Sequence, residues 1–195
     1  MMSAHRLRRA APFVFASAAA FLPAGTVAGA GPDEQALIED ALSAAPPAIR
    51  ETAKVMDENG TVLREGSGPY VCMPTPASLR SLGKEAMCAD AVWMAWNEAY
   101  MARKPFKTDR IGIAYMLSGD TGASNVDPYA TGPTADNQFV VEGPHVMILV
   151  PDPAQLEAIP ATPQTAGPYV MWKGTPYAHI MVPVGKRPAQ RTAGQ

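Results

Sequence analysis

Long apolar runs, basic clusters and closely spaced cysteines are all missing from this chain of 195 residues. Its longest apolar stretch, residues 10–22, is shorter than the roughly 20 residues that a membrane-spanning helix requires, so we expect no stable membrane anchor. Charged residues make up 17% of the chain and the net charge is −2, which provides no basic surface for nucleic acid. The chain has two cysteines, and they form neither a C-x-x-C redox pair nor a zinc knuckle.

The first 30 residues have the three parts of a cleavable secretory signal. Arg6, Arg8 and Arg9 form a positive start, residues 10–22 form an apolar core, and the small residues 28–30 suit a signal peptidase. The Arg8-Arg9 pair leaves the twin-arginine route open, but such pairs are common in ordinary signals, so we favour the Sec route. The sequence therefore predicts a periplasmic or secreted product that begins near Gly31.

Removal of this signal would leave a mildly acidic protein with one domain. The signal contains three arginines and no acidic residue, so its loss changes the net charge from −2 to −5. The remaining chain is long enough for one hydrophobic core and leaves little room for a second. We expect a globular domain over residues 31–184 and a disordered tail over residues 185–195.

Cys72 and Cys88 both lie in the exported part of the chain. An oxidising compartment favours a disulfide between them, and closing this short loop would stabilise the fold by about 3 kcal/mol. Two buried free thiols or two metal ligands are the competing interpretations. We favour the disulfide because export would place this even pair of cysteines in such a compartment.

Local patterns in the first half of the domain predict helices and short strands. Asp33 can cap a helix over residues 33–44, and Asn59-Gly60 is typical of a tight hairpin turn between strands 54–56 and 61–63. Further strands are expected at residues 70–73 and 111–117.

A second, longer helix is predicted over residues 84–103. Ala89, Trp93, Trp96 and Tyr100 recur at helical spacing, which indicates a helix buried against a sheet. This Trp- and Met-rich stripe could line a cofactor pocket, but ordinary core packing is the simpler interpretation.

Residues 118–143 are rich in Gly, Asp, Asn, Thr and Pro and show no sustained periodicity. A connection of this length is usually functional or disordered. Its oxygen-bearing side chains include Asp120, Asn125, Asp127, Asp136 and Asn137. They could hold calcium, but their spacing does not match an EF-hand, and such residues are common in turns.

Two His-x-Met triplets, His145-Val146-Met147 and His179-Ile180-Met181, lie in apolar segments that follow Pro. Residues two apart on a strand share a face, so each His accompanies its Met, and we expect the Val and Ile faces to pack under the helices. If the strands paired in register, two imidazoles and two thioethers would converge, a ligand set that suits copper. Structural histidines in apolar strands are the alternative.

Three function classes stay open at this point. The chain contains no G-x-S-x-G elbow, H-E-x-x-H helix, phosphate-binding loop or dinucleotide fingerprint, so a hydrolase-like enzyme would depend on His145 or His179 with an acid such as Asp120 or Asp127. The second class is a copper or other metal binder. The third, which the lack of catalytic motifs favours, is a binding or envelope module that recognises a small ligand or an envelope protein.

Several segments together resemble a family of uncharacterised secreted bacterial proteins. They are residues 110–117 (RIGIAYML), 123–125 (ASN), 143–147 (GPHVM) and 167–184 (GPYVMWKGTPYAHIMVPV). The resemblance implies export and a single domain. That family has no assigned activity, so it transfers no catalytic or binding residues.

The expected architecture is therefore a single α+β domain. We predict a mostly antiparallel sheet of five or six strands with the long Trp/Met-bearing helix packed on one face.

Overall fold

The computed structural model describes residues 31–164 and 167–191. The predicted signal over residues 1–30 and the end of the predicted tail, residues 192–195, lie outside the described residues. The elements in chain order are α1 (Pro32–Ser43), α2 (Pro47–Arg50), β1 (Lys54–Met56), β2 (Val62–Arg64), β3 (Val71–Met73), β4 (Met87–Ala89), α3 (Ala91–Met101), β5 (Gly112–Met116), β6 (Ala123–Ser124), β7 (Phe139–Val140), β8 (His145–Leu149), a 3₁₀ helix (Pro153–Leu156), β9 (Tyr169–Met171) and β10 (His179–Pro183).

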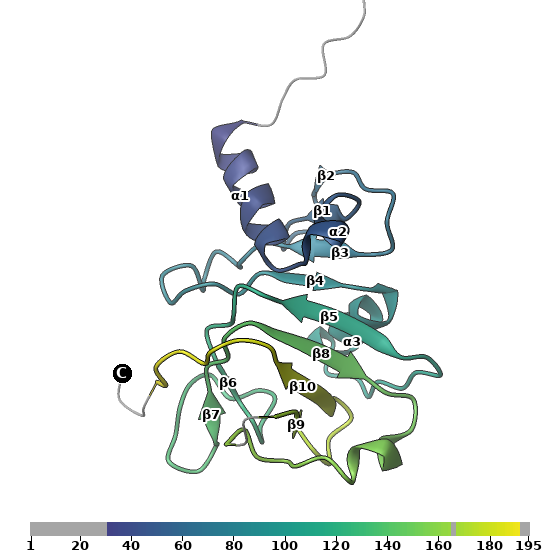
Figure 1. Cartoon of the computed structure of the whole chain (residues 1–195), viewed down its shortest axis with the longest axis vertical. Helices are drawn as coiled ribbons and strands as arrows, with labels where there is room; N and C mark the ends of the chain where they lie inside the picture. The colour runs from purple at the N-terminus through teal and green to yellow at the C-terminus, as the bar shows by residue number, and fades with distance from the viewer. Residues whose placement is uncertain (1–30, 165–166, 192–195) are drawn as a thin grey trace, which may run out of the picture.

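Eight of these strands form one mixed sheet in the order β2-β1-β3-β4-β5-β8-β10-β9 (Figure 1). Only β1 and β3 run parallel, and every other neighbouring pair is antiparallel. The α+β class and the mostly antiparallel sheet are confirmed, but the expected five or six strands were too few. Strands of two or three residues, such as β4 and β9, are too short to show a clear alternation in sequence.

The two longer helices lie on opposite faces of the sheet. Helix α1 packs with β1, β3 and β4, and α3 lies behind β4 and β5 in the view of Figure 1. Successive residues of a strand point to opposite faces, so Cys88 belongs to the core under α1 whereas Ala89 belongs to the core under α3. The sheet therefore separates two hydrophobic clusters.

The predicted helix over residues 84–103 is wrong in its first third. Met87–Ala89 form β4, which pairs with β3 and β5, and the helix begins only at Ala91. Asp90 causes this change of structure: its Oδ1 accepts hydrogen bonds of 2.9 Å from the N–H groups of Val92 and Trp93, and its Oδ2 accepts one of 2.7 Å from Ile113. Asp90 thus caps α3 and ties it to β5.

The disulfide between Cys72 and Cys88 is present. The two residues face each other in the antiparallel β3–β4 pair, with Cα atoms 3.9 Å apart. The bond therefore joins two strands. The predicted helix over residues 84–103 would instead have placed Cys88, and with it the bond, at the start of a helix.

The segment after β10 differs from the expected disordered tail. Residues 185–191 lie along the loop before β8, where Arg187, Gln190 and Arg191 make hydrogen bonds. The Gln190 side chain both donates to the Val141 carbonyl and accepts from the Val141 N–H, as a neighbouring strand would. We name residues 184–191 the C-terminal strap.

Candidate functional site

The two His-x-Met triplets lie on adjacent antiparallel strands and share one face of the sheet. Met147 of β8 stands directly opposite Met181 of β10, whereas His145 stands opposite Pro183. One step beyond this ladder, His179 lies level with the far end of β8, so the register places the two imidazoles toward opposite ends of the strand pair. This register does not bring all four side chains to one point, and copper binding stays a prediction.

The face that carries the His and Met side chains is the buried one. His145, Met147, His179 and Met181 are at most 6% exposed, and the two methionines belong to the core under α3. The expectation that the Val and Ile faces pack under the helices is wrong for these strands. On this face, β8 and β10 present Met, Leu and His side chains to the Trp residues of α3.

His145 is fully buried and has one polar contact. Its Nδ1 lies 2.8 Å from the carbonyl oxygen of Gly143. A carbonyl can only accept, so Nδ1 carries the proton and Nε2 presents a lone pair that has no hydrogen-bond partner among the described residues. Burial lowers the pKa of His145, which keeps the ring neutral.

His179 lies among three indole rings. The ring centroids of Trp93, Trp96 and Trp172 are 5.2, 5.6 and 5.2 Å from its own, all in edge-to-face arrangements. Its Nδ1 contacts the Tyr177 carbonyl at 2.9 Å, and burial lowers its pKa to about 4. His179 is therefore a neutral core residue with no carboxylate beside it in these contacts.

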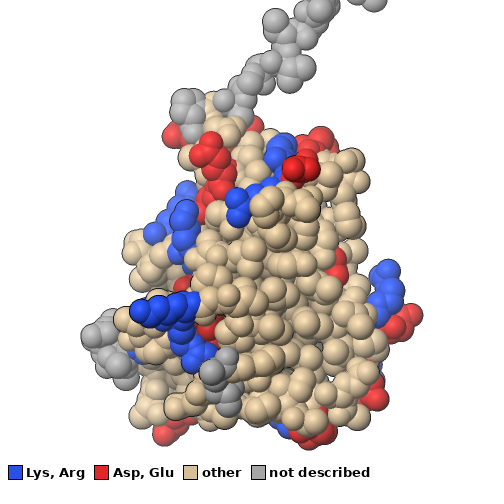
Figure 2. All heavy atoms as spheres, viewed as in Figure 1, with Lys and Arg blue, Asp and Glu red and all other residues tan. Residues whose placement is uncertain are grey.

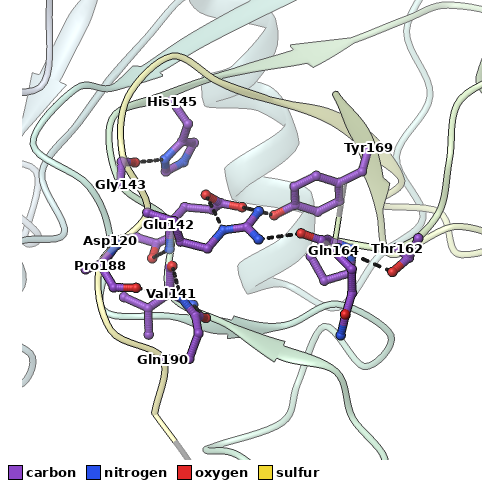
Figure 3. Close-up of polar contacts among 12 residues, drawn as sticks. Asp120, Val141, Glu142, Gly143, His145, Thr162, Gln164, Tyr169, Pro188 and Gln190 are labelled. Carbon is purple, nitrogen blue, oxygen red and sulfur yellow. Dashed lines mark hydrogen bonds and ion pairs between the residues drawn. The ribbon is translucent and has the colours of Figure 1, made fainter. Parts of the chain in front are cut away.

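A buried polar centre lies where the strap meets the start of β8 (Figure 3). Glu142, 1% exposed, accepts a 2.9 Å hydrogen bond from the Tyr169 hydroxyl and pairs with the Arg187 guanidinium. The Glu142 N–H donates to Asp120 Oδ1 at 2.7 Å, and the Asp120 N–H donates to the Glu142 carbonyl at 3.0 Å. His145 lies next to this network without a hydrogen bond to either acid (Figure 3).

Two acids of this region have raised pKa values. Burial, and then the charges of Glu85 and Glu142, raise the pKa of Asp120 well above its usual value. Burial also raises the pKa of Glu85, although the Thr121 N–H donates to its carboxylate. Burial thus favours the neutral form of both acids, whereas Glu142 pairs with Arg187.

Of the residues proposed from the sequence, only Asp120 and His145 lie at this centre. Asn125 donates to Gln138 and Ala161, and Asp127 caps the turn at Tyr129, so both have structural contacts elsewhere. Within the described part of the chain, no group of three or more His, Cys, Asp or Glu side chains could hold a metal ion. Calcium binding by the loop oxygens stays a prediction.

Glu142 and Arg187 were not singled out from the sequence. Glu142 ends the apolar run 139–141 just before a Gly-Pro strand start, and an acid in that position is a signal that could have drawn attention. Arg187 carries no such signal, because its partner lies 45 positions earlier in the chain.

The opposite face of β5, β8 and β10 is apolar and is only partly covered by the described residues. Two cross-strand rows run over it: Ile113, Ile148 and Ile180 in one, and Tyr115, Val146 and Val182 in the other. All six are partly exposed. Ile111 and Val184 lie two residues along the chain from Ile113 and Val182, beyond the ends of β5 and β10, and are 60% and 56% exposed. We call these eight residues the open sheet face. Figure 2, which looks onto this side, shows a broad area without charged side chains over the middle of the sheet.

The open sheet face has clear borders. Helix α1 lies over β1, β3 and β4 on one side, and on the other side the Ile row ends at Val170, which is fully buried. Among the described residues, no helix is long and apolar enough to cross a membrane.

Comparisons with protein-family models, with curated proteins and with solved structures found no match. The fold and the sites therefore define the class by themselves: an α+β domain with a mixed eight-stranded sheet, a disulfide and an uncharged sheet face.

Proposed function

We propose that this chain is an exported partner-binding module whose contact surface is the open sheet face. The observation that supports this is the pair of apolar rows on β5, β8 and β10, whose six side chains together with Ile111 and Val184 make eight hydrophobic side chains without a charge. A contiguous exposed apolar patch on a monomer is typical of an interaction site, whereas single exposed hydrophobic residues are ordinary.

The side chains of this face suit binding. Val and Ile side chains have few rotamers, so they lose little conformational entropy when a partner binds. Burying the part of each side chain that is still exposed contributes on the order of 1 kcal/mol. The absence of charge means that association requires no desolvation of ionic groups.

The shape of the face favours one amphipathic helix of a partner protein. Neighbouring strands lie about 4.8 Å apart, so β5, β8 and β10 span roughly 10 Å, which is close to the diameter of an α-helix. Helix α1 occupies the neighbouring strands of the same face, so a partner helix beside it would complete the layer.

A crosslinking experiment tests this proposal. A photo-crosslinking residue at Ile113 would be used in the native host, with the captured segment identified by mass spectrometry. We expect capture of an amphipathic helix, and we expect the Ile111→Asp, Val184→Asp double variant to abolish it. The control is the Val62→Asp, Val126→Asp double variant, since Val62 and Val126 are 41% and 46% exposed on other parts of the molecule.

Two outcomes would contradict the proposal. Equal capture by both double variants would mean that the open sheet face is not the contact surface. Capture of a second copy of this chain would mean that the face serves a homodimer, which analytical ultracentrifugation would show independently.

The alternatives from the sequence have weaker support. An enzyme that uses His145 or His179 needs an accessible imidazole, yet both rings are at most 2% exposed and neither is hydrogen-bonded to a carboxylate. Copper binding through the two triplets needs a common point that the β8–β10 register does not provide.

A further inference from the structure

A second site lies beside the polar centre, under the C-terminal strap. It is a pocket of about 430 Å³ between the loop before β4, the turn after β5 and the strap. Asp120 and Ser118 line it together with Val141 and Pro144, so it combines polar groups with apolar walls. It does not include the residues of the open sheet face and does not depend on the function proposed for that face.

Basic side chains surround this pocket in a protein that is acidic after loss of its signal. Lys84, Lys186 and Arg191 all line it. Lys84 pairs with Asp40, but among the described residues Lys186 and Arg191 form no ion pair with an acid. Figure 2 shows Lys and Arg side chains gathered on this side of the molecule, between α1 and the end of the strap.

The acids of the pocket do not cancel this positive charge. Glu142 is already paired with Arg187, which lies outside the pocket lining. Asp120 is held by the Glu142 N–H in surroundings that favour its neutral form. Within the described part of the chain, Lys186 and Arg191 are therefore left without an acidic partner.

The pocket also contains an unused hydroxyl. The Ser118 Oγ is buried, and among the described residues it has no hydrogen-bond partner. A buried hydroxyl without a partner is costly, and an acceptor in the pocket would satisfy it.

We propose that this pocket binds a small organic carboxylate, with Lys186 and Arg191 supplying the positive charge and the Ser118 hydroxyl donating a hydrogen bond to the ligand. Val141 and Pro144 would contact a short aliphatic body. A carboxylate accepts several charge-assisted hydrogen bonds, which a neutral amide of the same shape cannot match.

Isothermal titration calorimetry on the exported chain tests this with four matched probes: butyrate, butyramide, butylamine and inorganic phosphate. We expect butyrate to bind and butyramide to bind at least about tenfold more weakly. The Lys186→Ala, Arg191→Ala double variant should lose about tenfold or more in butyrate affinity, and Ser118→Ala about fivefold.

The control removes two positive charges elsewhere. Lys107 and Arg110 are exposed and lie outside this pocket, so the Lys107→Ala, Arg110→Ala double variant should keep its butyrate affinity. Equal losses in the two double variants would overturn the proposal, because they would reflect only net charge.

Several other results would also overturn it. Butyramide binding as tightly as butyrate would remove the role of the anion, and tighter binding of butylamine would show that the buried acids prefer a cation. Tighter binding of phosphate would define an inorganic oxyanion site. No binding of butyrate at millimolar concentrations would end the idea.

Discussion

Arg187 donates to the buried carboxylate of Glu142 from two of its guanidinium nitrogens, with Nε 3.1 Å from Oε2. This contact joins the strap to the start of β8 across 45 positions of sequence. Glu142 is 1% exposed, whereas the Arg187 side chain is 28% exposed, so the acid depends on the pair more than the base does.

Removing Arg187 should therefore destabilise the protein. Arg187→Ala leaves a buried acid without its cation, and we expect the free energy of unfolding to fall by about 3 kcal/mol in urea denaturation at pH 7. Arg110→Ala is the control: Arg110 and Asp109 are exposed and 3.9 Å apart, so we expect a change below about 1 kcal/mol. Similar losses in both variants would contradict the role given to the pair.

The strap should come loose in Gly143→Ala. A Cβ at this position would lie 2.1 Å from the backbone oxygen of Lys186, so the strap has to move. We expect a protease to cleave this variant near residues 184–191 faster than it cleaves the wild type. Mass spectrometry of the fragments would locate the cleavage sites. Gly132→Ala, where a Cβ meets nothing within 4 Å, should be cleaved like the wild type, and equal cleavage of the two variants would count against the packing of the strap.

The start of α3 should depend on Asp90. Asp90→Ala removes three hydrogen bonds from backbone N–H groups, and we expect a loss of about 2 kcal/mol in thermal or chemical unfolding. Asp90→Asn keeps an accepting oxygen for the helix cap and should lose less than Asp90→Ala. A neutral effect of Asp90→Ala would mean that packing alone defines the helix start.

Stability should fall in acid partly because of His179. Its pKa is about 4 in the folded protein and near 6.5 when unfolded, so the unfolded chain takes up the proton first as the pH falls below about 6.5. The stability that the neutral ring provides is complete above that value and decreases toward pH 4. At pH 5 the loss is roughly 2 kcal/mol.

The His179→Phe variant isolates this effect. Asp120 and Glu85 have raised pKa values and act in the opposite direction, so the difference between wild type and variant is more informative than either pH profile. We expect the wild type to lose more stability than the variant between pH 7 and pH 5. Parallel profiles would mean that His179 does not titrate as proposed.

Reduction of the Cys72–Cys88 bond should lower stability without abolishing the fold. The bond closes a short loop, and we expect a loss of about 3 kcal/mol in the Cys72→Ala, Cys88→Ala variant. The mass of the unreduced protein should be two hydrogen atoms below that of the reduced form. Two free thiols in protein from an oxidising compartment would contradict the bond.

Some features were predictable because their cause is local. The Asn59-Gly60 turn and the helix near residues 33–44 follow from backbone preferences within a few residues, and both lie close to where they were expected. The alternation that placed His145 with Met147 and His179 with Met181 on one face was also correct.

Other features were not predictable, because they depend on contacts between distant segments. Helical spacing of Ala89 with Trp93 fits a helix, yet Asp90 ends the strand and starts the helix once Ile113 of β5 supplies a third bond to it. Which face of β8 and β10 is buried was decided by α3, whose Trp residues pack on the His and Met side chains.

The sequence by itself determined the α+β class and the alternation within each strand, because propensity, spacing and side-chain period act over short ranges. The tertiary structure decided the strand order, the exposure of the apolar rows on β5, β8 and β10, and the meeting of Glu142 with Arg187. These depend on where distant segments meet, and the free energy of such contacts is not encoded in any one local pattern.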